Sequence, residues 1–185
     1  MIFRLFPGNR QDATIKALYG AIVAQARLPV FYRDYGVPDT VNGRFDMIVL
    51  HLALLLDRME AGSEPMRTQG QAVFDLFCRE MDGHFREIGI SDLKVPKEMK
   101  QVGQAFYGRR SVYREALAAP DNRMLAEAIT RNIYTEETDA KASAKAGAER
   151  LAAYVRTAAQ SLSRQDDLAN GQLAWPDPQA VQAAG

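Results

Sequence analysis

The chain has 185 residues, of which 47% are hydrophobic and 25% charged, a composition typical of a single globular domain. Lys and Arg number 23, as do Asp and Glu, so the formal net charge is zero, which argues against a DNA-binding protein or another general nucleic-acid binder. No apolar run approaches the ~20 residues that span a membrane. The first residues do not resemble a secretory signal, so we expect a cytoplasmic protein.

Few residues could bind a metal or carry out chemistry. The chain has one cysteine, Cys78, and two histidines, His51 and His84. A zinc site needs three or four protein ligands, so we predict no metal, and we expect no cofactor. Cys78 and His84 lie on or beside an apolar helix stripe, which indicates a structural thiol and a core histidine. Phosphate-binding glycine loops and nucleophile motifs are absent, so we predict no enzymatic activity.

Apolar residues recur at helical spacing along almost the whole sequence. The pattern predicts a first helix that Asp12 caps and that ends at Leu28, before Pro29. The next helix, over 43–60, is apolar on two sides, which places it in the middle of a bundle. Further helices are expected over about 63–88, 96–117, 124–133 and 148–162. Gly89 is a natural stop for the first of these.

These elements predict an all-α fold, a single-domain bundle of about six helices with the helix over 43–60 at its centre. The helical period is lost near the C-terminus, where we expect an irregular tail held by Leu173 and Trp175. The predicted divisions are an N-terminal segment, 1–11, a helical domain, 12–164, and the C-terminal tail, 165–185. Phe3, Leu5 and Phe6 in the first segment would allow peripheral contact with a membrane.

Charged residues form two seams on the central helix. Arg44, His51 and Arg58 are seven residues apart and nearly line up, whereas Asp46, Asp57 and Glu60 form the other seam. A buried helix keeps charge where the charge is paired or where it lines a groove. One interpretation of the basic seam is therefore internal pairing, with Asp39 or with acidic residues of the following helix. The other is a polar rim on a binding groove.

A second basic region runs from Lys94 to Arg114 and holds six basic residues against one acid, Glu98. Tyr107 points away from the apolar stripe of this helix and lies among these cations. Charges at helical spacing are usually only a solvated face. An exposed aromatic residue among cations is also typical of a surface that contacts ribosomal RNA, lipid headgroups or an acidic protein. Both interpretations stay open.

Three blocks of the sequence resemble the ubiquinol–cytochrome c chaperone family, which includes mitochondrial assembly factors of the cytochrome bc complex. The blocks are LPVFYRDYGVPDTVNGRFDMIVLH at 28–51, HFREIGISDLKVPK at 84–97 and AFYGRRSVY at 105–113. They occur in order, and the similarity extends over about residues 12–165. We expect a bacterial member, because the N-terminal extension typical of the mitochondrial proteins is lacking.

The resemblance implies an all-helical chaperone without enzymatic activity. Family members of mitochondria bind newly made cytochrome b, act with a small partner protein and contact the ribosome near its exit tunnel. The function implied for this chain is to bind newly made cytochrome b and assist assembly of the cytochrome bc complex, on the inner face of the cytoplasmic membrane. The alternative is a ribosome- or RNA-associated factor that acts through the basic face between Lys94 and Arg114.

The candidate binding surface combines the aromatic residues of the first block, the basic seam and the surface of the third block. A chaperone for a membrane protein needs an accessible apolar groove, and we expect the aromatic residues to form its lip. The predicted client- or partner-binding residues are Phe31, Tyr32, Tyr35, Arg44, His51, Arg58, Tyr107, Arg109 and Arg110. Residues suited to turns and caps form a structural motif between them. The predicted motif consists of Gly36, Pro38, Asp39, Thr40, Gly43 and Asp46.

Overall fold

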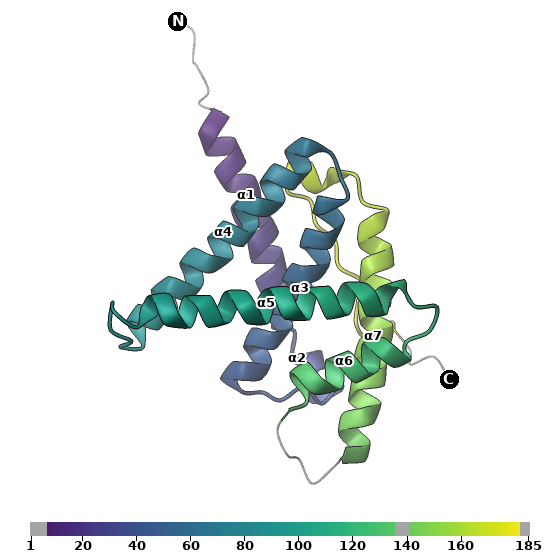
Figure 1. The fold of residues 1–185 in the computed structure, drawn as a ribbon. Coiled ribbons are helices and arrows are strands. Elements are labelled where there is room, and N and C mark those ends of the chain that lie inside the picture. Colours follow the sequence, from purple (N-terminus) through teal and green to yellow (C-terminus); the bar gives the residue numbers. More distant parts are fainter. Residues whose placement is uncertain (1–6, 136–140, 182–185) are drawn as a thin grey trace, which may run out of the picture.

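The computed structural model describes residues 7–135 and 141–181, which form helices and no strand (Figure 1). The α-helices are α1 Pro7–Ala26, α2 Pro29–Arg33, α3 Val41–Glu60, α4 Glu64–Glu87, α5 Val95–Ala118, α6 Arg123–Ile133 and α7 Lys141–Ser163, and a 3₁₀-helix, η1 Asp167–Asn170, follows. The predicted all-α fold is confirmed, with the six long helices in the expected order. Helix α2 is not predicted, because five residues are too few to produce a helical period.

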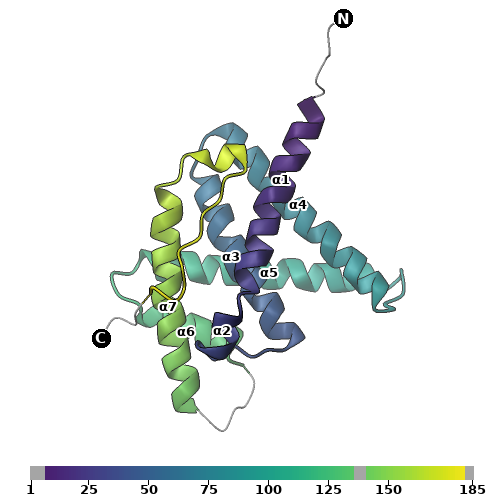
Figure 2. The same ribbon diagram turned by 180° about the vertical axis from the view of Figure 1, so that it is seen from behind.

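Helix α3 occupies the predicted central position. It packs against α1, α4, α5, α6 and α7, and every residue from Asp46 to Leu56 is buried. Figure 1 shows α5 crossing in front of α3, and Figure 2 shows α1 on the opposite side. The two apolar sides of the α3 sequence therefore correspond to two layers of neighbouring helices.

The predicted structural motif shapes the entry to α3. Thr40 caps the helix, since its Oγ1 accepts a hydrogen bond from the Gly43 N–H at 3.1 Å. Gly36 has a φ of +66°, a left-handed conformation that glycine adopts readily. We had grouped Gly43 with the residues suited to turns and caps, but it lies within α3. A Cβ at Gly43 would lie 2.0 Å from the carbonyl oxygen of Pro38, so glycine allows the preceding chain to approach the helix closely.

Helices α4 and α5 extend beyond the rest of the bundle and meet at a tight turn (Figure 1). We call residues 81–101 the arm; within it, Val95 alone is buried. Gly89 ends α4 as predicted, with a φ of +87°. Its N–H donates to the Arg86 carbonyl at 3.1 Å, and the Ile90 N–H donates to the Phe85 carbonyl at 3.0 Å, a Schellman motif.

Three local predictions need correction. His84 is exposed and is not a core histidine, because the arm extends past the helices that cover the first part of α4. Asp12 does not cap α1, which already begins at Pro7, a residue that the first turn of a helix accepts. Ser63, which we expected to cap the helix predicted from about residue 63, precedes α4, but its side chain makes no capping hydrogen bond. Residues 1–6, with the apolar side chains expected to contact a membrane, lie outside the described residues.

Residues 164–181, which we call the C-terminal segment, are largely irregular but belong to the packed structure. Figure 2 shows this segment running back beside α7 toward the middle of the bundle. Leu168 is buried. Leu173 and Trp175 pack against the core, and this contact was predicted for both. The segment is therefore a structural part of the bundle, in spite of its lack of regular structure.

Candidate functional site

Three of the predicted binding residues, Phe31, Tyr35 and His51, lie in the interior, where each is at most 1% exposed. Helix α2 turns Phe31 inward, with its ring centroid 4.9 Å from that of Tyr154 on α7 and 5.7 Å from that of His51. Phe31 and Tyr35 therefore do not form the apolar lip of a groove, and this prediction is wrong for both residues. Their rings are part of the core that joins α2, α3 and α7.

His51 is the centre of a buried hydrogen-bond network. Its Nδ1 lies 2.8 Å from the Met47 carbonyl oxygen, which can only accept, so Nδ1 carries the proton. Nε2 then accepts from the Tyr154 hydroxyl at 2.9 Å, and Gln25 Nε2 donates to the same hydroxyl at 3.0 Å. Burial lowers the pKa of His51 to about 4, so the ring is neutral at neutral pH. His51 therefore contributes hydrogen bonds to the core and no surface charge.

The C-terminal segment covers this network. The ring of Trp175 meets that of His51 edge-on, with centroids 5.0 Å apart. Gln25 Nε2 also donates to the Pro176 carbonyl at 3.2 Å, and the Tyr35 hydroxyl donates to the Pro178 carbonyl at 2.6 Å. The predicted binding residues of the interior therefore hold a segment of their own chain.

The basic seam of α3 is used for internal contacts. Arg58 Nε donates to the Leu162 carbonyl at 3.0 Å and Nη2 to the Gln165 carbonyl at 2.9 Å, so Arg58 satisfies the end of α7. Arg44 pairs with Asp39 at 2.7 Å, as the first interpretation expected, and both side chains are more than half exposed. With His51 hydrogen-bonded in the core, the three residues of the seam do not form one groove rim.

Tyr32 and Arg44 remain accessible on a separate surface. They line a pocket of about 570 Å³ beside α2 and the start of α3. The Tyr32 hydroxyl donates to the Ala26 carbonyl at 2.8 Å, which fixes the ring at the end of α1. This pocket therefore gathers part of the first sequence block, but without the buried aromatic residues that we had grouped with it.

The arginines of the third block bind α5 to α3. Arg109 Nη1 lies 2.7 Å from Asp46 Oδ1, without the direction of a hydrogen bond. Arg110 Nε donates to Asp57 Oδ1 at 2.6 Å, and Arg114 Nη2 approaches the same oxygen at 2.6 Å. Adjacent arginines on α5 thus reach acids eleven residues apart on α3, which fixes the crossing of the two helices. Glu60 also pairs with Arg110 and Arg114.

These ion pairs neutralise half of the basic region. Burial raises the pKa of Asp46 to about 6, and the neighbouring guanidinium of Arg109 opposes this shift. The three arginines contact the acidic seam of α3. The sequence already indicated this pairing, because the two segments carry complementary charges. The remaining cations are the three lysines of the arm, Lys94, Lys97 and Lys100, which are all exposed.

Tyr107 lies over a small aromatic cleft between α4 and α5, and its exposure, 56%, confirms that it points away from the apolar stripe. The ring centroids of Phe74 and Phe106 lie 5.6 and 5.3 Å from that of Tyr107. We call the hollow of about 220 Å³ lined by Leu56, Gly70, Phe74, Phe106 and Tyr107 the aromatic cleft. Its charged rim consists of Glu60, Arg67 and Arg110.

The candidate set included only Tyr107 and Arg110 of this cleft, and Phe74 is among the residues that it missed. Its spacing placed it on the buried face of α4, and the structure leaves its ring half-buried, so the helical period gave no sign of a cleft. An apolar floor with a charged rim is the arrangement by which protein surfaces take up one large apolar side chain of a partner. The aromatic cleft is therefore the best candidate for a binding site.

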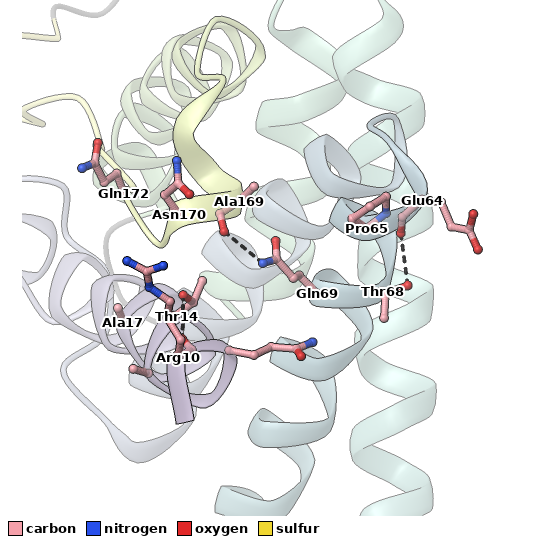
Figure 3. A pocket seen from close by; sticks show the side chains of 12 residues that line it. Arg10, Thr14, Ala17, Glu64, Pro65, Thr68, Gln69, Ala169, Asn170 and Gln172 are labelled. Carbon is pink, nitrogen blue, oxygen red and sulfur yellow. Dashed lines mark hydrogen bonds between the residues drawn. The ribbon is translucent and has the colours of Figure 1, made fainter. Parts of the chain in front are cut away.

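Another hollow of the described surface has a different character (Figure 3). It measures about 970 Å³ and lies between α1, the start of α4 and η1. Polar and small side chains line it, among them Arg10, Thr14 and Gln69, whose Nε2 donates to the Ala169 carbonyl at 3.0 Å. Within residues 7–135 and 141–181 no three His, Cys, Asp or Glu side chains gather as a metal site. The lining of this hollow mixes polar with small apolar side chains and holds no aromatic ring.

The family model of the ubiquinol-cytochrome C chaperones matches residues 33–175. The chain belongs to this family. The predicted resemblance is thereby confirmed, and the matched region runs from α2 to Trp175 in the C-terminal segment. The match therefore includes His51, Tyr154 and Trp175 of the interior, but not Gln25, and it includes the aromatic cleft.

Named relatives agree with the family. The ubiquinol-cytochrome-c reductase complex assembly factor 1 of Xenopus laevis is 25% identical over 172 residues, which are 90% of this chain and 84% of that protein. Its Drosophila melanogaster counterpart is 26% identical over 90% of this chain and 65% of its own length. The crystal structure of the Cbp3 homolog from Brucella abortus has a TM-score of 0.85 and 36% identity, and the match covers 98% of this chain and 100% of that one.

The family accounts for two further features of the chain. Its members are assembly factors, which agrees with the prediction that the chain is not an enzyme. In the part of the chain that the structure describes, every helix is too short or too polar to cross a membrane. The aromatic cleft is a part of this chaperone's described surface where aromatic rings line a defined hollow.

Proposed function

We propose that this chain is an assembly chaperone of the cytochrome bc complex and that it binds newly made cytochrome b. The family and its assembly factors support a role in the assembly of ubiquinol-cytochrome c reductase. The observation that carries the proposed binding is the exposed ring of Tyr107 above Phe74 and Phe106. A protein that shelters apolar helices needs such an accessible apolar anchor point.

The cleft is suited to holding one apolar side chain of a client helix. Its wall is rigid, because Arg110 and Arg114 bind α5 to Asp57 on α3. A rigid wall lowers the entropy that binding would otherwise cost. The charged rim can pair with polar groups at the end of a client helix and exclude water from the anchor.

Two experiments test this function. Deletion of the gene in its host should lower the amount of assembled cytochrome bc complex and leave other respiratory enzymes unchanged. A photo-crosslinking residue at Tyr107 should capture newly made cytochrome b, whereas one at Val41, which is exposed on another part of the surface, should not. Normal levels of the complex in the deletion strain would contradict the assembly role. Equal capture from both positions would contradict the cleft.

The alternative function as a ribosome- or RNA-associated factor has less support. It relied on the basic face between Lys94 and Arg114, and Arg109, Arg110 and Arg114 pair with acids of α3. Contact with the ribosome near its exit tunnel and with a small partner protein stay predictions from the family resemblance. Replacement of the three arm lysines with glutamate tests the ribosome contact by co-sedimentation.

A further inference from the structure

The arm exposes aliphatic side chains that the rest of the bundle does not use. Leu93 is 94% exposed and Ile88 is 59% exposed, and they lie on either side of the turn between α4 and α5. Burial of such side chains in an apolar environment is favourable, so the nearly full exposure of Leu93 beside the partly exposed Ile88 at a projecting tip suits a contact outside this chain. Figure 1 shows that no other helix of the bundle approaches this tip.

Three lysines follow the exposed leucine. Lys94, Lys97 and Lys100 are exposed, and among the described residues none of them lies within ion-pair distance of an acid. The acids of the arm are placed elsewhere. Asp82 and Asp92 pair with Arg86, and Glu98 is half-buried on the flank of α5. Glu87 is exposed at the end of α4.

The arm as a whole is formally neutral, but its three lysines lie on the α5 side, and the exposed face of α5 continues from them. Lys97, Lys100, Gln104, Tyr107 and Ser111 follow one another at spacings of three and four residues, and all are exposed. Residues at this spacing lie on one side of a helix, here the side turned away from α3. This face has no acid between Lys97 and Ser111 apart from the flanking Glu98.

We propose that the chain docks on an anionic lipid surface through the tip of the arm and the exposed face of α5. Leu93 and Ile88 enter the boundary between headgroups and acyl chains, and the three lysines contact the headgroups. A surface helix with apolar and cationic side chains binds anionic membranes in this way. Lipid fits better than RNA, because the aliphatic side chains gain from hydrocarbon and would gain little from a phosphate backbone.

The docked orientation would bring the aromatic cleft close to the membrane. Tyr107 lies on the exposed face of α5 and also covers the cleft. A client helix that leaves or enters the bilayer could therefore meet the cleft at the membrane surface. The lipid contact itself is independent of the client, so it can be measured with the purified chain alone.

Vesicle flotation of the full chain tests the proposal. One set of vesicles is phosphatidylcholine alone, and in the other a third of the lipid is phosphatidylglycerol. We expect partition into the anionic vesicles only, weakened by added salt. The double variant Lys97→Glu/Lys100→Glu should bind at least 20-fold more weakly, since each lysine near an anionic surface contributes about fivefold. Leu93→Ser should bind several-fold more weakly.

The matched control is Lys16→Glu/Arg131→Glu, which changes the net charge equally at exposed positions of α1 and α6 that take part in no ion pair of the described structure. This control should bind as the unchanged chain does. All substituted side chains are exposed, so thermal unfolding should show the same stability for every variant. Absence of partition, or an equal loss in the control, would overturn the proposal. Loss of ribosome co-sedimentation by the arm variant with unchanged vesicle binding would assign the lysines to RNA instead.

Discussion

His51 and most of the arm of residues 81–101 belong to sequence blocks that resemble the family, yet they differ in the partners of their side chains. The hydrogen bonds of His51 join groups of the same chain, from Gln25 through Tyr154 to Met47, although the buried Trp175 Nε1 above them has no hydrogen-bond partner among the described residues. In the arm, Leu93 and the lysines have no such partner within the described structure. Similar sequence blocks can therefore encode either the interior or an interaction surface.

The difference separates the work of the two regions. The His51 network joins α1, α3, α7 and the C-terminal segment, so its side chains determine the stability of the bundle. The arm contributes one buried residue, Val95, and Met81 and Phe85 pack partly against the core, so only its exposed side chains can change with little effect on folding. Substitutions at paired positions in the two regions should expose this contrast.

The two histidines give the largest expected contrast. His51→Ala removes a buried ring and leaves the Tyr154 hydroxyl without its acceptor, so we expect a loss of about 3–5 kcal/mol in the free energy of unfolding. His84→Ala alters an exposed side chain of the arm and should change this free energy by less than about 0.5 kcal/mol. Urea unfolding of both variants provides the measurement. Similar losses at the two positions would break the comparison.

Acid stability should sharpen the description of the interior. The pKa of His51 falls from 6.5 to about 4 on folding, so the unfolded chain binds more protons between these values and stability rises with pH there. The pKa of Asp46 rises from 3.8 to about 6, so the folded chain binds more protons and stability falls with pH between these values. The two contributions oppose each other in the unchanged chain.

Single variants separate the two contributions. Relative to the unchanged chain, His51→Gln should lose the contribution that rises with pH and Asp46→Asn the one that falls, each on the order of 3 kcal/mol. The measurement is the free energy of unfolding in urea at intervals from pH 4 to 7. A difference between His51→Gln and the unchanged chain that does not vary with pH would argue against a buried neutral ring.

Two glycines test how closely each region is packed. Gly43→Ala should cost about 1–3 kcal/mol, because the new Cβ would collide with the Pro38 carbonyl oxygen. Gly103→Ala on α5 has no atom within 4 Å and should stabilise the chain by about 0.5–1 kcal/mol through helix propensity. Opposite signs in thermal unfolding would confirm the contrast. A stabilising Gly43→Ala would show that the approach of the two segments is looser than described.

The smallest expected effect concerns the tip of the arm. Leu93→Ala should change the free energy of unfolding by less than about 0.5 kcal/mol, because the side chain is almost fully exposed. Its effect should appear in vesicle partition and not in urea unfolding. A substantial loss of stability would place Leu93 within the packed structure and remove it from the proposed lipid contact.

The helical period predicted the fold well because it depends on local spacing. It identified α3 as central from its two apolar sides, and it placed Tyr107 on the outer side of α5. The same period placed His84 in the core, since it reports the side of a helix on which a residue lies and not how far the neighbouring helices extend. Helix α2, with Phe31, was too short for any period.

The candidate site could be predicted only in part, because pairing across the bundle depends on how helices cross. Asp46 and Asp57 on α3 and the arginines Arg109 and Arg110 on α5 are visible in the sequence as complementary charges. Their contacts, however, join residues more than fifty positions apart. Trp175 and His51, whose rings are in contact, are likewise far apart in the sequence. Aromatic residues of a recognisable block carry no local signal of whether they face the core or a partner.

The C-terminal segment has a consequence for the order in which this chain can fold. Synthesis is vectorial, and residues 164–181 leave the ribosome after all the α-helices that the structure describes. Until then the hydroxyl of Tyr35 and the ring of His51 lack the contacts with Pro178 and Trp175 that cover them. A nascent chain that ends at α7 would therefore present an open aromatic groove, and the final residues convert it into a closed core. The last described part of the chain to be synthesised therefore completes the core.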